Sequence, residues 1–280
     1  MIANLKTILI CMTEQLGTQA TSSALAYALS LAEQAGARVT LQAASVELDL
    51  PHAWISRLVA ELVADENRRL RLSAEGIAER ARSDAAAMGV LCRTETPQLA
   101  YPELVAAVRA QSRLHDVSVI DAEPDALTGD RGLIEELLFD SGRPLIVVPS
   151  GYERFAARRI LIAWDGSAQA SRAMHDALPL LKQAEAVEIV SVSGEKDLSE
   201  SVPGAELAPS LAHHDVPVTV VDLAAADGDV AETLRTRATL ACADLIVMGA
   251  FVHPRWRELV WGGVTQALLR SCPVPLFLSR

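Results

Sequence analysis

A glycine-rich stretch near the C-terminus contains the residues best suited to holding a phosphate group. Gly249 directly follows the apolar run 244–248. The pair Gly262 and Gly263 then precedes Thr265 and a segment with helical periodicity. Glycines let backbone N–H groups approach an anion, and a helix N-terminus adds partial positive charge. The alternative is a plain connection in which the glycines only let the chain turn.

Three charged residues could complete such a site. Asp165 follows another apolar run, 159–163, and its carboxylate could accept a hydrogen bond from a ribose hydroxyl or an adenine amino group. The alternative, which the residue by itself favours, is that Asp165 caps the helix that is expected to begin near Ala168. Arg255 and Arg257 lie inside the glycine-rich stretch, where they either reach phosphate oxygens or remain solvated surface charges.

The composition excludes several classes of protein. The chain has 280 residues, half of them hydrophobic, and a net charge of −11, which is opposite to that of a generic nucleic-acid binder. No apolar run reaches the roughly 18 residues of a membrane span, and the N-terminus lacks a signal-peptide pattern. We therefore expect a soluble cytoplasmic protein with neither nucleic acid nor membrane as a partner.

Motifs for catalysis and metal binding are missing from the sequence. It contains no Gly-x-x-x-x-Gly-Lys-Ser/Thr, no Gly-x-Gly-x-x-Gly after a strand and no Gly-x-Ser-x-Gly. His213, His214 and His253 have no metal-ligand spacing around them. We therefore assign no catalytic residue and no metal site, and we expect a binding protein without efficient catalysis.

Short apolar runs alternate with helical patterns along the chain, and the whole pattern occurs twice. Residues 159–163 repeat residues 7–11 almost letter for letter, and Pro275 stands in the same context as Pro144. The offset is 152 at the first match and 131 at the second, so the second copy is 21 residues shorter. The missing part corresponds to the long amphipathic stretch 54–88 of the first copy.

This alternation predicts parallel sheets that are covered by helices on both faces. The repeat predicts two such α/β domains, at 1–150 and 151–280. In doubly wound sheets, ligands bind outside the carboxyl ends of the strands, where the winding direction reverses. In the second domain those ends carry Asp165, residues 192–193 and Gly249, which places the glycine-rich stretch at the expected edge.

The second copy resembles the universal stress protein family. The motifs that carry the resemblance are Ile160-Leu-Ile-Ala-Trp-Asp-Gly-Ser167, Met248-Gly-Ala250, Gly262-Gly263-Val264-Thr265 and Cys272-Pro-Val-Pro-Leu276. The first copy is similar more weakly, so the resemblance covers the chain as a tandem pair. It implies a Rossmann-like (adenine nucleotide alpha hydrolase-like) fold, with a five-stranded parallel sheet of order 3-2-1-4-5 in each half.

The family signature Gly-x2-Gly-x9-Gly-Ser/Thr is matched in part. Gly249 and Gly262 stand at its first and third glycine positions, whereas Val252 stands at the second. Gly263 stands at the hydroxyl position, and Thr265 follows two residues later. The resemblance implies a nucleotide site in which an aspartate contacts adenosine and a second-strand backbone contacts adenine, formed by Asp165, Val192, Gly249, Gly262, Gly263, Val264, Thr265 and Arg255.

Val252 and Pro254 are unfavourable for a triphosphate. A β-branched residue fits poorly where a positive φ is required, and its side chain would obstruct a phosphate at the backbone. Proline removes an N–H donor. An adenosine or AMP-like ligand is less affected than ATP with Mg²⁺. The corresponding region of the first copy is acidic and would repel phosphate, so we expect that copy to be structural; its acidic residues are Asp121, Glu123, Asp125 and Asp130.

These features predict a stress-response regulatory protein that binds at most one adenine nucleotide, ATP or AMP, in its second half. One alternative is a slow ATP hydrolase, with Thr265 and Arg255 or Arg257 at the phosphates. Another is a structural adaptor that binds no nucleotide and engages an unknown protein partner. Dimers of the family pair their last strands, so we expect residues 145–148 and 276–278 to pair within the chain as a pseudo-dimer, or across a homodimer.

Overall fold

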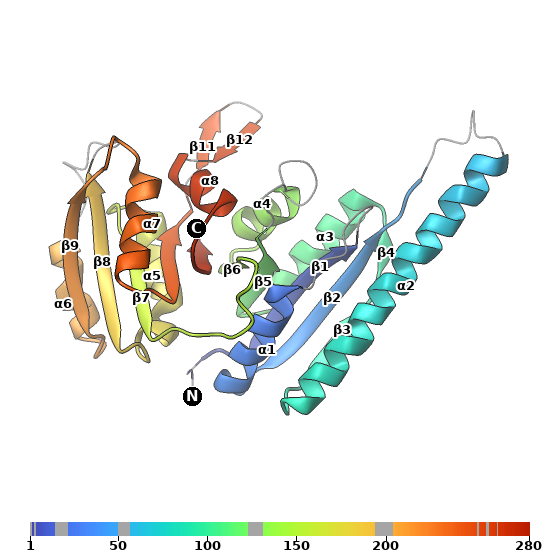
Figure 1. Cartoon of the computed structure of the whole chain (residues 1–280), viewed down its shortest axis with the longest axis horizontal. Helices are drawn as coiled ribbons and strands as arrows, with labels where there is room; N and C mark the ends of the chain where they lie inside the picture. Colours follow the sequence, from blue (N-terminus) through green and yellow to red (C-terminus); the bar gives the residue numbers. More distant parts are fainter. Residues whose placement is uncertain are drawn as a thin grey trace.

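The computed structural model describes the chain apart from residues 1, 3, 15–21, 50–56, 123–130, 194–203, 251, 256–257 and 262. Its centre is one sheet of eleven strands in the order β3-β2-β1-β5-β6-β13-β10-β7-β8-β9, with β4 paired to β2. Figure 1 shows that the N-terminal half of the chain supplies the strands at one end of this sheet and the C-terminal half supplies those at the other end. The N-terminal half supplies β1 (Thr7–Glu14), β2 (Arg38–Val46), β3 (Cys92–Glu95), β4 (Gln98–Leu99), β5 (Val117–Asp121) and β6 (Leu145–Val148).

The C-terminal half supplies the other strands of the sheet and a separate two-stranded ribbon, β11-β12. Taken in chain order, the main strands of each half have the predicted order 3-2-1-4-5 and run parallel. The structure also shows that the sheets of the two halves form one continuous sheet. Strand β4 and the β11-β12 ribbon are present in addition to the five predicted strands of each half. These strands are β7 (Arg159–Ala163), β8 (Ala186–Ser193), β9 (Val218–Ala224), β10 (Leu245–Gly249), β11 (Val252–Arg255), β12 (Glu258–Trp261) and β13 (Leu276–Ser279).

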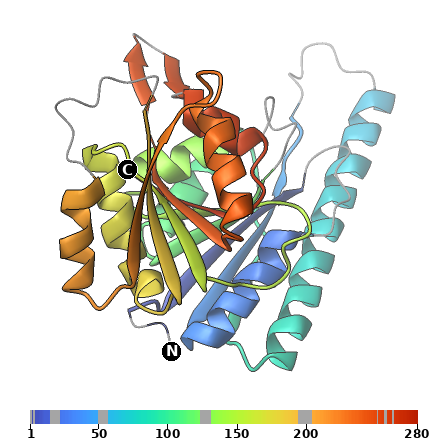
Figure 2. The same cartoon turned by 60° about the vertical axis from the view of Figure 1, so that its left-hand side comes forward.

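The helices cover both faces of the sheet (Figure 2). One core cluster lies between the sheet and α1, α2, α5 and α6, and a second lies on the opposite face under α3, α4, α7 and α8. The central strands are apolar without alternation because both of their faces are buried. The helices are α1 (Ser23–Ala35), α2 (Arg57–Ala87), α3 (Tyr101–Ser112), α4 (Arg131–Asp140), α5 (Ala168–Leu181), α6 (Gly204–Ala212), α7 (Val230–Leu240) and α8 (Gly263–Arg270).

The two halves join at a pair of antiparallel strands, β6 and β13. Phe277 lies opposite Ile146, which is the strand pairing that the family resemblance implies. The segment between β6 and β7 reinforces this junction. Tyr152 donates its hydroxyl proton to the backbone oxygen of Pro273 at 2.5 Å, and Phe155 packs edge-on against the fully buried Tyr27. Because the strands pair, neither half leaves this sheet edge exposed.

An equivalent aspartate holds the start of the first strand in each half. One carboxylate oxygen of Asp116 accepts hydrogen bonds from the backbone N–H groups of Lys6 and Thr7, at 2.8 and 2.9 Å. Asp244 does the same at the start of β7, where it accepts two backbone N–H groups at 2.8 Å each. The internal repeat therefore includes side-chain contacts as well as the hydrophobic pattern.

The halves differ most in the helix that follows their second strand. Helix α2 has 31 residues, whereas its counterpart α6 has 9. This is the length difference that the sequence repeat predicts. In α2 the first buried residue is Leu70, and the side chain of Asn67 is hydrogen-bonded to the backbone of Leu48. The turns at the start of the helix extend past the body of the protein (Figure 1). Within the described residues, no helix is both long and apolar enough to cross a membrane.

Candidate functional site

The predicted ligand edge lies where the C-terminal half of the sheet changes its winding direction. Strands β7 and β10 are neighbours there, with Ala163 beside Met248, and β8 lies on the other side of β7. The backbone N–H of Trp164 donates to the carbonyl of Val190 at 2.9 Å, which extends this alignment past the end of β7. The structure therefore brings the ends of three strands together, and they carry the predicted site residues Asp165, Val192 and Gly249.

Asp165 forms a tight turn with the start of α5. Its carboxylate accepts the backbone N–H of Ser167 at 3.1 Å, and the intervening Gly166 has φ +71°. The side chain that caps α5 is Ser167, whose hydroxyl oxygen accepts the N–H of Ala170 at 3.1 Å. Asp165 is therefore not the cap of α5, which corrects the alternative role considered for this residue. The sequence signal for Ser167 was present, since serine is a preferred cap and stands directly before the helix.

Gly249 has a steric role in the fold. A Cβ atom at this position would lie 2.4 Å from the backbone nitrogen of Ala170 and 2.5 Å from the carbonyl carbon of Gln169. Only a residue without a side chain lets the first turn of α5 come this close to the end of β10. This contact explains the glycine without any ligand, and it fixes the helix N-terminus next to the strand end.

The N-terminus of α8 presents one open position. Gly263 is the first residue of α8 and is exposed, and a Cβ atom there would meet nothing within 4 Å. Val264 is half-buried, and Thr265 is 2% exposed. The backbone at Gly263 is therefore the accessible part of this helix end, whereas Thr265 belongs to the packed interior. Gly262, which the sequence places beside it, lies outside the described residues.

Within the stretch between Gly249 and Gly262, residues 252–255 and 258–261 pair as an antiparallel ribbon, whereas the sequence suggested an open phosphate-cradling loop. Val252 lies opposite Trp261, and Pro254 lies opposite Leu259. β-Branched and aromatic residues favour strands, and proline is tolerated in a two-stranded ribbon because one edge of each strand faces away from its partner. Val252 therefore has an extended backbone. Arg255 is the last residue of β11, and the described part of the structure does not include its side chain.

The corresponding point of the N-terminal half is closed by a carboxylate. Asp121 ends β5 as Gly249 ends β10, and it accepts the Ser22 hydroxyl at 2.6 Å and the backbone N–H of Ala24 at 2.8 Å. Burial raises the pKa of Asp121 above its ordinary value, and the hydrogen bonds from Ser22, Ala24 and Ser23 only partly oppose this effect. A carboxylate thus takes the place at the N-terminus of α1 where an anionic ligand would bind. The predicted acidic residues Glu123, Asp125 and Asp130 lie outside the described residues.

Comparison with known proteins gives a family match for the C-terminal half of the chain. The family model described as the universal stress protein family matches residues 156–280. No protein among those with curated descriptions matches the sequence. A universal stress protein from Archaeoglobus fulgidus DSM 4304 has the same fold, at 17% identity and a TM-score of 0.68, over 97% of this chain and 98% of that one.

Two structures from Pseudomonas aeruginosa share the fold as well. A candidate universal stress protein from strain UCBPP-PA14 is 14% identical with a TM-score of 0.60, over 99% of this chain and 94% of its own. A protein of unknown function from strain PAO1 is 13% identical with a TM-score of 0.57, over 99% and 93% of the two chains. The C-terminal half of the chain is thus a domain of the universal stress protein family, and the N-terminal half repeats its fold.

Proposed function

We propose that this protein acts in the stress response as a cytoplasmic binding protein and holds one adenine nucleotide at the winding reversal of its C-terminal half. The observation that supports the proposal is that Asp165 and the end of β8 at Val192 follow neighbouring strands at one sheet edge. The exposed helix start at Gly263 follows β10 in the chain through the β11-β12 ribbon, and we propose that it completes the site. The corresponding place in the N-terminal half is taken by Asp121, so one nucleotide per chain is expected.

The local structure favours a nucleotide with few phosphates. An acceptor such as Asp165 suits ribose or adenine donors, and the N–H groups at the start of α8 suit a single phosphate. In place of an open loop with several glycines, the chain forms the β11-β12 ribbon, with Pro254 in the strand. A ribbon uses backbone N–H groups for its own pairing, which leaves fewer for the outer phosphates. We therefore expect AMP to bind at least as well as ATP, with or without Mg²⁺.

Isothermal titration calorimetry of the full chain with AMP and ATP, each with and without Mg²⁺, tests the proposal. The variant Gly263→Val adds a side chain at the exposed helix start, where a Cβ atom meets nothing within 4 Å. We therefore expect it to fold and to weaken AMP binding about tenfold or more. Asp165→Ala should weaken both nucleotides similarly. The exposed Glu153→Ala serves as a control that leaves binding unchanged.

The outcomes separate the alternatives. Absence of saturable binding at millimolar AMP and ATP, with the native circular dichroism spectrum retained, would reject a nucleotide-binding function. Steady phosphate release from ATP that Gly262→Val abolishes would instead favour a slow hydrolase at the same edge. Equal affinity of the wild type and both site variants would place any bound nucleotide elsewhere on the protein.

An adaptor function is the second candidate, and the projecting part of α2 favours it. Leu58 and Leu62 are 68% and 61% exposed and lie one helical turn apart. Residues at this spacing share one face of a helix, so they form a small apolar stripe outside the protein body. If no nucleotide binds, this stripe becomes the preferred point of contact with a protein partner. The double variant Leu58→Glu and Leu62→Glu should then lose that contact and keep its thermal stability.

A further inference from the structure

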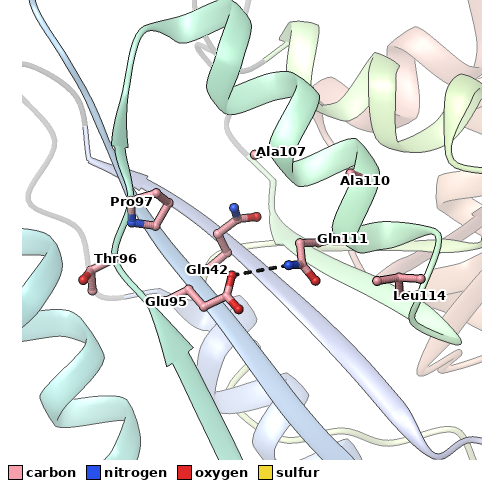
Figure 3. Close-up of a pocket in the computed structure, with 8 residues that line it drawn as sticks. All are labelled: Gln42, Glu95, Thr96, Pro97, Ala107, Ala110, Gln111 and Leu114. Carbon is pink, nitrogen blue, oxygen red and sulfur yellow. Dashed lines mark hydrogen bonds between the residues drawn. The ribbon is translucent and has the colours of Figure 1, made fainter.

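A pocket lies in the N-terminal half, away from the winding reversal of the C-terminal half. It has a volume of about 520 Å³ and opens between β2, the β3–β4 connection and α3. Figure 3 shows the side chains that line it. Its walls combine apolar groups from Pro97, Ala110 and Leu114 with polar groups from Gln42 and Glu95. The universal stress protein resemblance assigns no residue to this place.

Gln42 is the most informative residue of the pocket. It is 2% exposed, and its carbonyl oxygen Oε1 has no hydrogen-bond partner among the described residues. The amide group points into the pocket, toward the space that Pro97 and Gln111 border (Figure 3). A buried acceptor without a donor destabilises a protein, so such groups call for an explanation. A ligand N–H group that enters the pocket would supply the missing donor.

Glu95 adds a negative charge to the same pocket. Its register partner is Gln42, so the two side chains come from adjacent positions on β2 and β3. Among the described residues, the carboxylate accepts a long hydrogen bond from the Gln111 amide, at 3.5 Å, and forms an ion pair at 2.9 Å with Arg93, whose side chain is 77% exposed. Exposed ion pairs contribute little, so Arg93 can exchange for another cation. The carboxylate and the Gln42 oxygen together form an acceptor pair.

The C-terminal half shows that the fold does not need these polar residues. The aligned registers of β2-β3 and β8-β9 place Val190 at the position of Gln42 and Val221 at the position of Glu95. Both valines belong to an apolar core cluster or pack against it. Two valines therefore satisfy the architecture at this place, and the polar pair of the N-terminal half needs a different explanation.

We propose that this pocket binds a small organic cation, a primary ammonium or a guanidinium group on a short aliphatic body. The N–H groups of the cation donate to Gln42 Oε1 and to the Glu95 carboxylate, and its charge is compensated by that carboxylate. The aliphatic part lies against Ala110, Leu114 and Pro97. The volume suits a ligand of a few to some twenty non-hydrogen atoms, at the small end of ligand pockets.

The test is a titration of the full chain with n-butylammonium chloride, followed by ¹H–¹⁵N NMR, in parallel with 1-butanol as the neutral match. We expect saturable shifts for n-butylammonium with a Kd on the order of 1–10 mM, and at least tenfold weaker binding of 1-butanol. Gln42→Val and Glu95→Val copy the residues of the C-terminal half, and each should weaken the binding of n-butylammonium about tenfold or more. The exposed Glu206→Gln removes one charge on α6 and should change nothing.

Gln42→Val also has a stability readout, because it removes an unpartnered buried acceptor. We expect its Tm to equal or exceed that of the wild type, which would show that the loss of binding does not come from unfolding. Three results would overturn the proposal: no saturation with n-butylammonium, equal binding of 1-butanol, or unchanged binding in a folded Gln42→Val protein. The first would mean that the pocket holds only solvent, and the second that its apolar wall alone attracts ligands.

Discussion

The two halves of the chain share one fold but differ in the residue that ends their fourth strand, β5 in one half and β10 in the other. In the N-terminal half, β5 ends in Asp121, whose buried carboxylate accepts hydrogen bonds from Ser22 and Ala24 at the start of α1. In the C-terminal half, β10 ends in Gly249, and α5 lies so close that no side chain fits. Both helices have a serine cap, Ser22 in α1 and Ser167 in α5. The difference is that the carboxylate of Asp121 also accepts hydrogen bonds at the start of α1, whereas the start of α5 packs directly against Gly249.

This comparison bears on where the proposed ligand site lies. The carboxylate of Asp121 occupies the place of a bound anion at the N-terminus of α1, so we expect no anionic ligand at this point of the N-terminal half. In the C-terminal half the strand-end position equivalent to Asp121 is Gly249, which has no side chain, and α8 begins at an exposed glycine. The second and third strands differ in the opposite sense. There the N-terminal half has the polar pair Gln42 and Glu95, whereas the C-terminal half has two valines.

The largest effect is expected from a side chain at the end of β10. Gly249→Ala places a Cβ atom 2.4 Å from the backbone of α5, so the helix or the strand must move. We expect a loss of about 2–4 kcal/mol in the free energy of unfolding, measured by urea denaturation. Gly263→Ala is the matched control, because the space around it is open, and it should be neutral or stabilise the protein by up to about 1 kcal/mol. Equal losses in both variants would mean that Gly249 is not tightly packed.

The aspartates that hold the first strands test how far the halves are equivalent. Asp116→Ala and Asp244→Ala each leave two backbone N–H groups without their acceptor. We expect each variant to lose about 1–2 kcal/mol in the free energy of unfolding, and the two losses to be similar. The exposed Glu153→Ala is the control for removing a carboxylate from the surface. A large loss in only one variant would show that the duplicated contact stabilises only that half.

The smallest effect concerns the charge of Asp121. Because burial raises its pKa in the folded state above the ordinary value of 3.8, the fold favours the protonated carboxyl. The stability from this group is complete below about pH 3.8 and is lost as the pH rises through the folded pKa. We expect Asp121→Asn, which keeps an acceptor for Ala24 and carries no charge, to gain stability relative to the wild type as the pH rises through this window.

Urea denaturation of the wild type and Asp121→Asn at several values between pH 3 and pH 7 measures this difference. A difference that shrinks with rising pH would show that the hydrogen bonds from Ser22, Ser23 and Ala24 outweigh burial, and that the folded state prefers the ionised carboxylate.

The sequence by itself determined the repeat, the parallel α/β class and the edge at which the candidate site lies. These follow from local patterns, because a buried strand such as residues 159–163 is continuously apolar and an amphipathic helix has its own period. The strand order in each half and the pairing of residues 145–148 with 276–278 came from the family resemblance, and the structure contains both.

Only the tertiary structure decided how individual residues are used. The sequence could not show that Gly249 lies against the backbone of α5, that Asp121 reaches α1 about a hundred residues away, or that Gln42 and Glu95 share a pocket. Each of these is a contact between segments far apart in the chain, and no local period encodes it. The β11-β12 ribbon is another such case. A glycine-rich stretch is compatible with a loop, and only the pairing of Val252 with Trp261 shows that this one forms strands.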